Sequence, residues 1–297
     1  MIQKYIEWMK EKNYGPSALE GAAHILRRYD EYLNNNFHLK PTQVTEDHLE
    51  GYVLYLKQTL SNGTLRLHLS RIRGFHRFCH QRGAMLYDPT QNLIPLKKEQ
   101  LLKSVPTEKT LKYLLDQPDE HTYHGIRDGA ILELMYSSGL RNQETRDLKV
   151  GDVDLKEELV RVRSGKGCKG RTAPLGRKAC ALIQKYLLVT RPKYLRSPGE
   201  DHLFLTERGG SLPEWSINAI LSRYKKTSEL TKLITPHSLR HACALHMLRG
   251  GAPIQTVQAI LGHKRISTTQ IYTRLDSKDL KRAHQKFHPR ERLAKRQ

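Results

Sequence analysis

The chain has 297 residues and a formal net charge of +21, with 51 Lys and Arg against 30 Asp and Glu. Its hydrophobic content of 38% and charged content of 27% exclude a disordered tail and indicate one large globular domain or two ordinary ones. Such a positive excess favours a polyanionic partner, most often nucleic acid, over a basic protein that is merely kept soluble by its charge.

The spacing of the cysteines and the length of the apolar segments indicate the cellular compartment of the protein. None of the four cysteines belongs to a Cys-x-x-Cys pair: Cys79, Cys168, Cys180 and Cys243. The N-terminus lacks the apolar core of a signal peptide, and no apolar run approaches the length of a membrane span. A basic amphipathic helix rich in Trp or Phe, which would suit an anionic membrane surface, is also missing. We expect a reducing, cytoplasmic setting.

The first ninety residues predict a bundle of helices. A stripe of apolar residues at helical spacing predicts the first helix over residues 1–12: Ile2, Ile6 and Met9. Ser17 and Glu20 have the spacing of a capping box, which predicts a second helix from Ser17 to about residue 34. A third helix is expected after Thr45, with four residues for its core face: Leu49, Val53, Leu54 and Leu56.

A fourth helix is predicted over residues 62–82, and its two faces differ in chemistry. One face is suited to a core: Leu65, Leu69, Ile72, Phe75, His76 and Cys79. The remaining positions carry four arginines: Arg66, Arg71, Arg73 and Arg77. This helix is the candidate for lying along a DNA groove, and a solvated basic face on an ordinary bundle helix is the alternative.

Residues 93–106 lack a sustained periodic spacing of apolar residues and form a predicted linker. The pattern of apolar residues differs after this linker. Helices are expected near residues 107–117 and 124–138. Side chains alternate with a period of two over residues 159–163, and residues 170–175 can pair back onto this strand, so a β-hairpin is predicted. Helices are expected again after it. The expected fold is therefore mainly α with a small antiparallel β-sheet (α+β), in two domains. The helical domain covers residues 1–92 and the mixed domain residues 107–297.

His237 and Arg240 are candidates for a phosphate site. Thr235 and a following Pro predict the start of a helix that ends at two glycines after residue 249, so both side chains lie on one face near its N-terminus. A helix N-terminus, an imidazole and a guanidinium together suit phosphate oxygens. The alternative is a surface pair without a shared ligand. His237 and His241 are four residues apart, which is a spacing that two metal ligands on a helix can have. The Glu of a zinc His-Glu-x-x-His motif is absent, so no metal is expected.

Two more cations stand beside glycines. Arg141 follows Gly139, and Glu144 is three residues further on, where it can brace the guanidinium. Lys166 occupies the predicted hairpin tip, where it can donate a proton to a departing alkoxide. A cation at a helix C-terminus and a solvated turn lysine are the ordinary alternatives for Arg141 and Lys166.

Tyr272 is the candidate nucleophile, and His263 lies nine residues before it in a Leu-Gly-His segment. A phenol with a pKa near 10 is only about a thousandth ionised at pH 7, which costs roughly 4 kcal/mol. Guanidinium and imidazole groups around a phosphate have to offset that cost by attracting charge or accepting the proton. A Tyr in this setting is ordinarily a packing residue, so the constellation carries the assignment.

In these residues the chain resembles the tyrosine recombinases, also called the phage integrase family, and particularly their Xer type. The resemblance fills six catalytic positions in order: Arg141, Lys166, His237, Arg240, His263 and Tyr272. It makes Glu144 the support of the first arginine and leaves Lys169 as an alternative hairpin lysine. Lys169 and Arg171, beyond the hairpin tip, are also expected to contact DNA.

The resemblance implies a fold and a mechanism. Residues 1–92 would be a helical core-binding (SAM-like) DNA-binding domain, and residues 107–297 the catalytic domain. Tyr272 would attack a scissile phosphate and leave a 3′-phosphotyrosyl bond, with Arg141 and Arg240 stabilising the charge. Lys166 would protonate the leaving 5′ oxygen, His237 would transfer a proton, and His263 would bind phosphate. No cofactor is expected, because the phosphotyrosine conserves the bond energy.

The resemblance also implies partners. One is double-stranded DNA that contains a specific site. The other is a set of further subunits, since a homotetramer would hold two DNA duplexes while they exchange strands through a Holliday junction. The tetramer would act alone or with a paralogous recombinase. The basic tail of residues 278–297 would dock on the neighbouring subunit, whereas a frayed tail that touches DNA is the alternative. Two other functions stay open: DNA relaxation of the type IB topoisomerase kind, and DNA binding without catalysis, as in a regulator.

Overall fold

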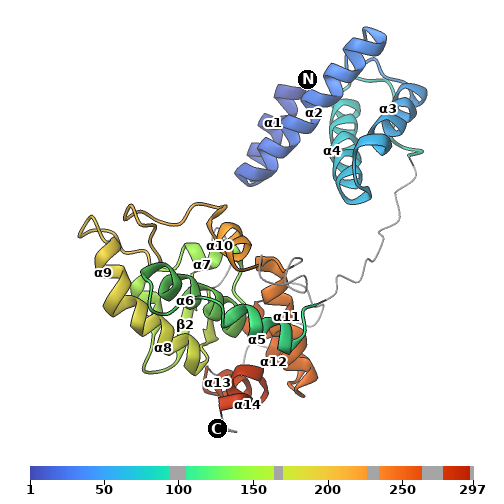
Figure 1. The fold of residues 1–297 in the computed structure, drawn as a ribbon. Helices are drawn as coiled ribbons and strands as arrows, with labels where there is room; N and C mark the ends of the chain where they lie inside the picture. The colour runs from blue at the N-terminus through green and yellow to red at the C-terminus, as the bar shows by residue number, and fades with distance from the viewer. Residues whose placement is uncertain (94–104, 164–169, 226–233, 263–276, 295–297) are drawn as a thin grey trace. The chain divides into compact units, whose positions relative to one another are not determined.

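The computed structural model describes residues 1–93, 105–163, 170–225, 234–262 and 277–294. The chain divides into two compact units, Met1–Leu102 and Lys103–Gln297, and each is considered by itself (Figure 1). The division falls within the segment 93–106 that the sequence marks as a linker. Both units are mainly helical, and the second contains a three-stranded antiparallel sheet, as expected for the fold class.

The first unit contains the four predicted helices: α1 (Ile2–Glu11), α2 (Pro16–Phe37), α3 (Glu46–Thr59) and α4 (Asn62–Gln81). The capping box expected at Ser17 is wrong, because α2 begins at Pro16 with Gly15 as its N-cap. Proline suits the first helical position, since its fixed φ is already helical and its missing N–H would have had no partner. Leu54 also departs from expectation, with 60% of its surface exposed. The buried face of α3 consists instead of Leu49, Tyr52 and Leu56.

The apolar face of α4 forms the centre of this unit. All six residues predicted for that face are buried, and they pack against apolar residues of α1, α2 and α3. Gly74 allows α1 to approach closely, since a Cβ atom there would lie 2.5 Å from the Tyr5 hydroxyl oxygen. Buried His76 shares a hydrogen bond of 3.0 Å with Tyr29, and burial lowers the pKa of His76 to about 4. His76 is therefore a neutral core residue.

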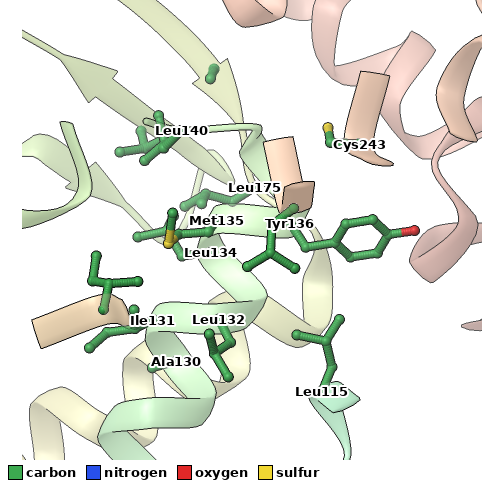
Figure 2. Packing of buried hydrophobic residues seen from close by; sticks show 14 of the residues in the cluster. Leu115, Ala130, Ile131, Leu132, Leu134, Met135, Tyr136, Leu140, Leu175 and Cys243 are labelled. Carbon is green, nitrogen blue, oxygen red and sulfur yellow. The ribbon is translucent and has the colours of Figure 1, made fainter. Parts of the chain in front are cut away.

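In the second unit, α6 (Tyr123–Ser138) is the central helix. Every residue from Gly125 to Ser138 is buried, so other elements cover α6 on all sides. Figure 2 shows the α6 side chains Leu132, Met135 and Tyr136 pointing in different directions into the core. The other helical segments described in this unit up to residue 225 are α5 (Glu108–Leu115), α7 (Asn142–Arg146), η1 (Val150–Asp152), α8 (Arg177–Lys185), η2 (Tyr186–Thr190), α9 (Arg191–Tyr194) and α10 (Ser216–Lys225).

The sheet of this unit has the order β1-β2-β3, with strands β1 (Val153–Asp154), β2 (Leu159–Val162) and β3 (Arg171–Pro174). The predicted hairpin is confirmed as the antiparallel pair of β2 and β3, in which Val162 lies opposite Arg171. The short β1 was not anticipated. The tip that carries Lys166 and Lys169 lies outside the described residues.

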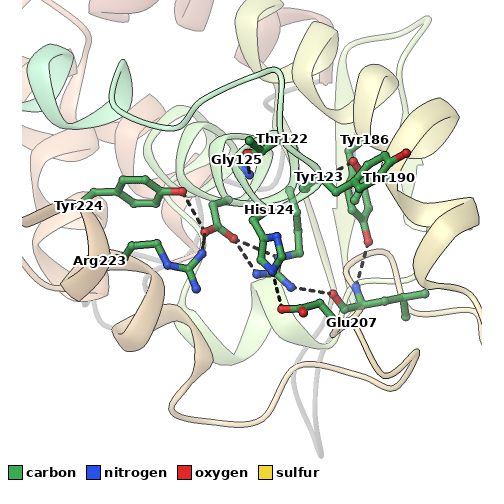
Figure 3. A network of polar contacts seen from close by, with 12 residues as sticks. Thr122, Tyr123, His124, Gly125, Tyr186, Thr190, Glu207, Arg223 and Tyr224 are labelled. Carbon is green, nitrogen blue, oxygen red and sulfur yellow. Dashed lines mark hydrogen bonds and ion pairs between the residues drawn. The ribbon is translucent and has the colours of Figure 1, made fainter.

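A polar network fixes α6 to α10. The buried carboxylate of Asp128 accepts hydrogen bonds from Arg127, from Arg223 at 2.7 Å and from the Tyr224 hydroxyl at 3.0 Å. Figure 3 shows Arg223 and Tyr224 of α10 converging on this carboxylate. Several charged hydrogen bonds compensate its loss of hydration, so Asp128 anchors α10 to the central helix.

The described C-terminal part consists of α11 (Pro236–Arg249), α12 (Ile254–Leu261), α13 (Ser277–Phe287) and α14 (Pro289–Ala294). Thr235 caps α11 by accepting a hydrogen bond from the Ser238 N–H at 3.1 Å, which confirms the predicted helix start. The tail was expected to dock on a neighbouring subunit. In this structure α13 packs against its own unit, where Leu280 joins the core.

None of the helices in the described ranges combines the length and apolar character that a membrane crossing requires.

Candidate active site and nucleic-acid interface

Arg141 lies at a sharp turn between two helices. Gly139 ends α6 in the left-handed region with a φ of 61°, and a Cβ atom there would collide with Leu261 Cδ2. Only glycine suits both conditions, and the turn sends the chain into α7. The main-chain N–H of Arg141 then donates to Glu144 Oε2 at 2.9 Å, and its Nη1 donates to Glu144 Oε1 at 2.5 Å. The predicted brace between Arg141 and Glu144 is present.

Arg240 approaches the same place from α11, although it is buried with only 4% of its surface exposed. Its Nη1 donates to the Gly139 carbonyl oxygen at 2.6 Å, and its Nη2 donates to the Leu261 carbonyl oxygen at 2.5 Å. Both acceptors stand at helix C-terminal ends, where carbonyls lack partners within the helix and the dipole favours a cation. Arg240 therefore joins the ends of α6 and α12 while it presents positive charge to the site.

Glu144 is the common acidic partner of three arginines. Arg171 of β3 binds it with both terminal nitrogens, from Nη1 to Oε1 at 2.8 Å and from Nη2 to Oε2 at 2.7 Å. Arg240 Nη1 lies 3.7 Å from Oε2. Burial raises the pKa of Glu144, but the hydrogen bonds from Arg171 and Arg141 outweigh that effect and lower the pKa to about 2. Glu144 is thus ionised at neutral pH.

The cluster of Arg141, Arg171, Arg240 and Glu144, hereafter the arginine cluster, is positive. Three guanidiniums and one carboxylate leave two positive charges. Burial and the neighbouring Arg141 and Arg171 lower the pKa of Arg240 to about 10, which still leaves it charged at pH 7. The side chain of Arg141 is 50% exposed, whereas that of Arg240 is 5% exposed. An anion that reaches the cluster from solvent would meet Arg141 first.

His237 lies in the first turn of α11, one turn before Arg240, and is exposed. Its ring stands edge-on to that of His241, with the centroids 4.1 Å apart and the planes at 73°. The helix begins where the sequence predicts, so His237 lies in its first turn, but His237 is exposed whereas Arg240 is buried. The arrangement also presents the exposed imidazole beside the N–H groups of a helix N-terminus, which suits an anionic ligand.

Four of the predicted site residues lie outside the described residues: Lys166, Lys169, His263 and Tyr272. Their neighbours in the chain lie at the arginine cluster. Arg171 follows the hairpin tip closely in sequence, and Gly262, with a φ of 65°, directly precedes His263. The side chain of Arg171 fills the space beside Gly262, where a Cβ atom would lie 2.6 Å from Arg171 Cδ.

Arg171 was expected to contact DNA, but its guanidinium has partners within the protein. Besides its two bonds to Glu144, its Nε donates to the Ile260 carbonyl oxygen at 3.0 Å. Its side chain is only 15% exposed. No local signal in the sequence links Arg171 to a carboxylate 27 positions earlier. Only the pairing of β3 with β2 and the turn at Gly139 bring the two together.

The arginines of α4 form a candidate nucleic-acid interface in the first unit. Arg77 is exposed, and the other three are half-buried: Arg66, Arg71 and Arg73. Arg73 donates from Nη2 to the Leu93 carbonyl oxygen at 2.6 Å, so it ties α4 to the chain that follows this helix. The remaining three arginines occupy positions of α4 outside its set of buried residues.

Comparisons with known proteins identify the family of the chain. Residues 105–279 match the model of the phage integrase family. The chain is similar to tyrosine recombinase XerD of Staphylococcus epidermidis, with 34% identity over 98% of this chain and 99% of the relative. It is also 35% identical to tyrosine recombinase XerC of Thermodesulfovibrio yellowstonii, over 90% of this chain and 91% of that protein.

A solved structure supports the fold. The Tn1549 transposon integrase, in complex with circular intermediate DNA, superposes with a TM-score of 0.70 at 19% identity, covering 95% of this chain and 97% of that one. The family match spans the arginine cluster, and the relatives extend over nearly the whole chain. The chain therefore belongs to the phage integrase family, and it is a tyrosine-type site-specific recombinase, an enzyme that cleaves and rejoins DNA strands.

Proposed function

We propose that the chain binds a specific site in double-stranded DNA and exchanges strands through a 3′-phosphotyrosyl intermediate and a Holliday junction. The observation that carries this proposal is the arginine cluster. It joins Arg141, Arg171 and Arg240, which are far apart in sequence, around a single carboxylate and retains two positive charges. A phosphodiester carries one negative charge and gains more in the transition state, so the cluster suits that ligand.

Arg141 and Arg240 would hold the non-bridging oxygens of the scissile phosphate. Arg240 is fixed by two main-chain carbonyls and would reorganise little when charge develops on the phosphate. Arg141 is half-exposed and braced by Glu144 through Nη1, so its guanidinium can also reach a ligand from the solvent side. His237, at the start of α11, would accept or donate a proton beside the same phosphate.

Tyr272 would attack the phosphorus, so that a P–O bond forms to the phenol and the bond to the 5′ oxygen breaks. Lys166, or its neighbour Lys169, would protonate the departing 5′ oxygen, and His263 would bind the phosphate. These roles rest on the sequence pattern and the family, since all four residues lie outside the described ranges. The reaction conserves the energy of the diester in the phosphotyrosine, so the chemistry requires neither a nucleotide cofactor nor a metal.

DNA binding would use both units. The net charge of +21 and the arginines of α4 favour a long contact with the phosphate backbone. The Tn1549 integrase, a structural neighbour, was solved in complex with DNA. We propose that residues 1–92 form the core-binding domain and residues 107–297 the catalytic domain, with Arg66, Arg71 and Arg77 facing DNA.

The working assembly would be a homotetramer on two duplexes, alone or with a paralogous recombinase. Its setting would be the cytoplasm, where the three described cysteines would remain thiols, as in this structure: Cys79, Cys180 and Cys243. The two alternatives that the sequence left open, a type IB topoisomerase and a non-catalytic regulator, are not favoured by the near full-length similarity to Xer recombinases.

Covalent capture tests the proposal and identifies the target site in the same experiment. The protein is incubated with sheared genomic DNA of its source organism, denatured, and the DNA that remains attached is sequenced. We expect one enriched sequence linked at a 3′ end to a peptide containing Tyr272, and no adduct from Tyr272→Phe. Adducts at random sequences would favour a topoisomerase, and adducts from Tyr272→Phe would contradict the nucleophile assignment.

A further inference from the structure

Arg171 connects three elements of the catalytic unit. It starts β3, its two terminal nitrogens bind Glu144 of α7, and its Nε binds the Ile260 carbonyl oxygen near the end of α12. Each bond is between 2.7 and 3.0 Å, and the side chain is 15% exposed. A side chain bound on three nitrogens has little freedom to turn toward an incoming ligand.

The bond to Glu144 determines the direction of Arg141. A paired guanidinium and carboxylate lie in one plane, so Arg171 fixes the rotation of the Glu144 carboxylate about its final bond. Each carboxylate oxygen then has a second lone pair available on the other side. Arg141 uses both, through its main-chain N–H and its Nη1. A carboxylate without Arg171 could rotate, and the half-exposed Arg141 side chain would rotate with it.

The bond to Ile260 acts on a second part of the site. The chain leaves α12 through Gly262 and continues directly to His263. Arg171 fills the space beside Gly262, which has a left-handed φ of 65° and whose Cβ atom, if present, would lie 2.6 Å from Arg171 Cδ. The position where the chain departs toward His263 and Tyr272 is therefore packed against the same side chain that orients Glu144.

We infer that Arg171 is a positioning residue for phosphoryl transfer, which aims Arg141 through Glu144 and holds the end of α12 from which the segment of His263 and Tyr272 departs. This inference rests on the proposed function. Arg171 itself does not contact the phosphate. Replacement by lysine retains the charge but loses the paired geometry, since an ammonium group is a point charge without a planar fork.

The test compares Arg171→Lys with a matched control, Arg191→Lys. Arg191 is also half-buried and donates to main-chain oxygens of Glu200 and His202, but it lies outside the arginine cluster. The substrate is a nicked duplex of the sequence obtained by covalent capture. Affinity, melting temperature and the rate of adduct formation at saturating DNA are measured for each variant.

We expect Arg171→Lys to bind DNA within about threefold of the unsubstituted chain and to form the adduct about 100-fold more slowly, because misplacement of about 1 Å has an effect of that size. Arg191→Lys should retain the rate even if its melting temperature falls equally. Equal rates for Arg171→Lys and the unsubstituted chain would overturn the inference, and so would a loss confined to affinity, which indicates a DNA contact. Failure of the unsubstituted chain to form any adduct would instead refute the proposed function.

Two further measurements identify the route. The double variant Glu144→Gln with Arg171→Lys should be no slower than the slower single variant, because both changes disturb one pathway. On a substrate with sulfur in place of the bridging 5′ oxygen, the leaving thiolate needs no proton. That substrate should restore the rate of Lys166→Ala but not of Arg171→Lys. The route through Glu144 would be overturned if the two single variants lost rate additively in the double variant. It would also be overturned if the sulfur substrate restored the rate of adduct formation of Arg171→Lys.

Discussion

His284 and Ser137 join α13 to the central helix α6, since His284 Nε2 donates to the Ser137 carbonyl oxygen at 2.8 Å. Ser137 lies in the last turn of α6, shortly before Arg141. His288, one turn further along the chain, stacks on His284 with ring centroids 4.5 Å apart and contacts the Tyr136 carbonyl oxygen at 3.3 Å. Two fully buried imidazoles therefore hold the tail against the helix that leads into the active site.

The first prediction is that acid weakens this attachment. Burial lowers the pKa of His284 to about 4 and that of His288 well below its ordinary value of 6.5, and the neighbouring His284 lowers the latter further. The detached helix would take up protons below pH 6.5, whereas the packed helix resists until about pH 4. Stability of the packed state should thus fall as the pH drops from 6.5 toward 4. Hydrogen exchange of residues 279–290 at about pH 7.5 and about pH 5 measures the effect.

A matched pair of variants isolates the histidine contribution. His284→Gln removes the titrating ring but retains an N–H donor for the Ser137 oxygen, so its exchange rates should depend less on pH. His121→Gln changes an exposed histidine in the loop before α6 and should behave like the unsubstituted chain. Identical pH dependence for His284→Gln and the unsubstituted chain would contradict the prediction.

The second prediction concerns Glu144→Gln. This change retains the shape of the side chain but removes the negative charge that three guanidiniums share. A shift of the Glu144 pKa from 4.5 to about 2 corresponds to roughly 3 kcal/mol of folding free energy at neutral pH. The ionised carboxylate contributes this above pH 4.5, and the contribution declines as the pH falls through about 2. Urea unfolding at about pH 7 and about pH 3 should show a smaller difference between Glu144→Gln and the unsubstituted chain at the lower pH.

Local patterns in the sequence were sufficient for much of the fold. The six buried residues predicted for the core face of α4, the start of α11 at Thr235 and the brace between Arg141 and Glu144 all depend on neighbours within about one helical turn. Such interactions repeat with the period of the helix, so a short stretch of sequence is enough to infer them.

Contacts between distant segments could not be inferred in the same way. Arg171 is predicted to contact DNA because it is a basic residue after a glycine-rich hairpin, and its partners within the protein could not be inferred because they depend on three elements meeting. Leu54 was instead misjudged locally, since at about 100° per residue it lies on the face of α3 opposite Leu49 and Leu56 and is exposed. The attachment of His284 to Ser137 likewise joins segments 147 residues apart.

The third prediction concerns the arginines of α4 and their dependence on salt. A protein that neutralises about 6–10 phosphates loses about 10³–10⁵ in affinity between about 50 and 200 mM salt. Arg77 is exposed, so Arg77→Gln should weaken binding and reduce the slope of log affinity against log salt by about 1. Lys185→Gln, which removes a surface cation paired with Glu120, serves as the control. A slope for Arg77→Gln equal to that of the control would remove Arg77 from the interface.

The last prediction separates the two arginines proposed to be catalytic, Arg141 and Arg240, by their burial. Arg141→Ala removes a half-exposed side chain and should change the free energy of unfolding by about 1 kcal/mol or less. Arg240→Ala leaves the Gly139 and Leu261 carbonyl oxygens without their donors, so it should cost about 2–4 kcal/mol. Both variants should form the covalent adduct about 10²–10³-fold more slowly, since each loses a charge at the phosphate. Urea unfolding and adduct assays on the same samples check both effects. Equal destabilisation by the two changes would mean that Arg240 does not hold the helix ends together, whereas a normal cleavage rate in either variant would exclude that arginine from the phosphate site.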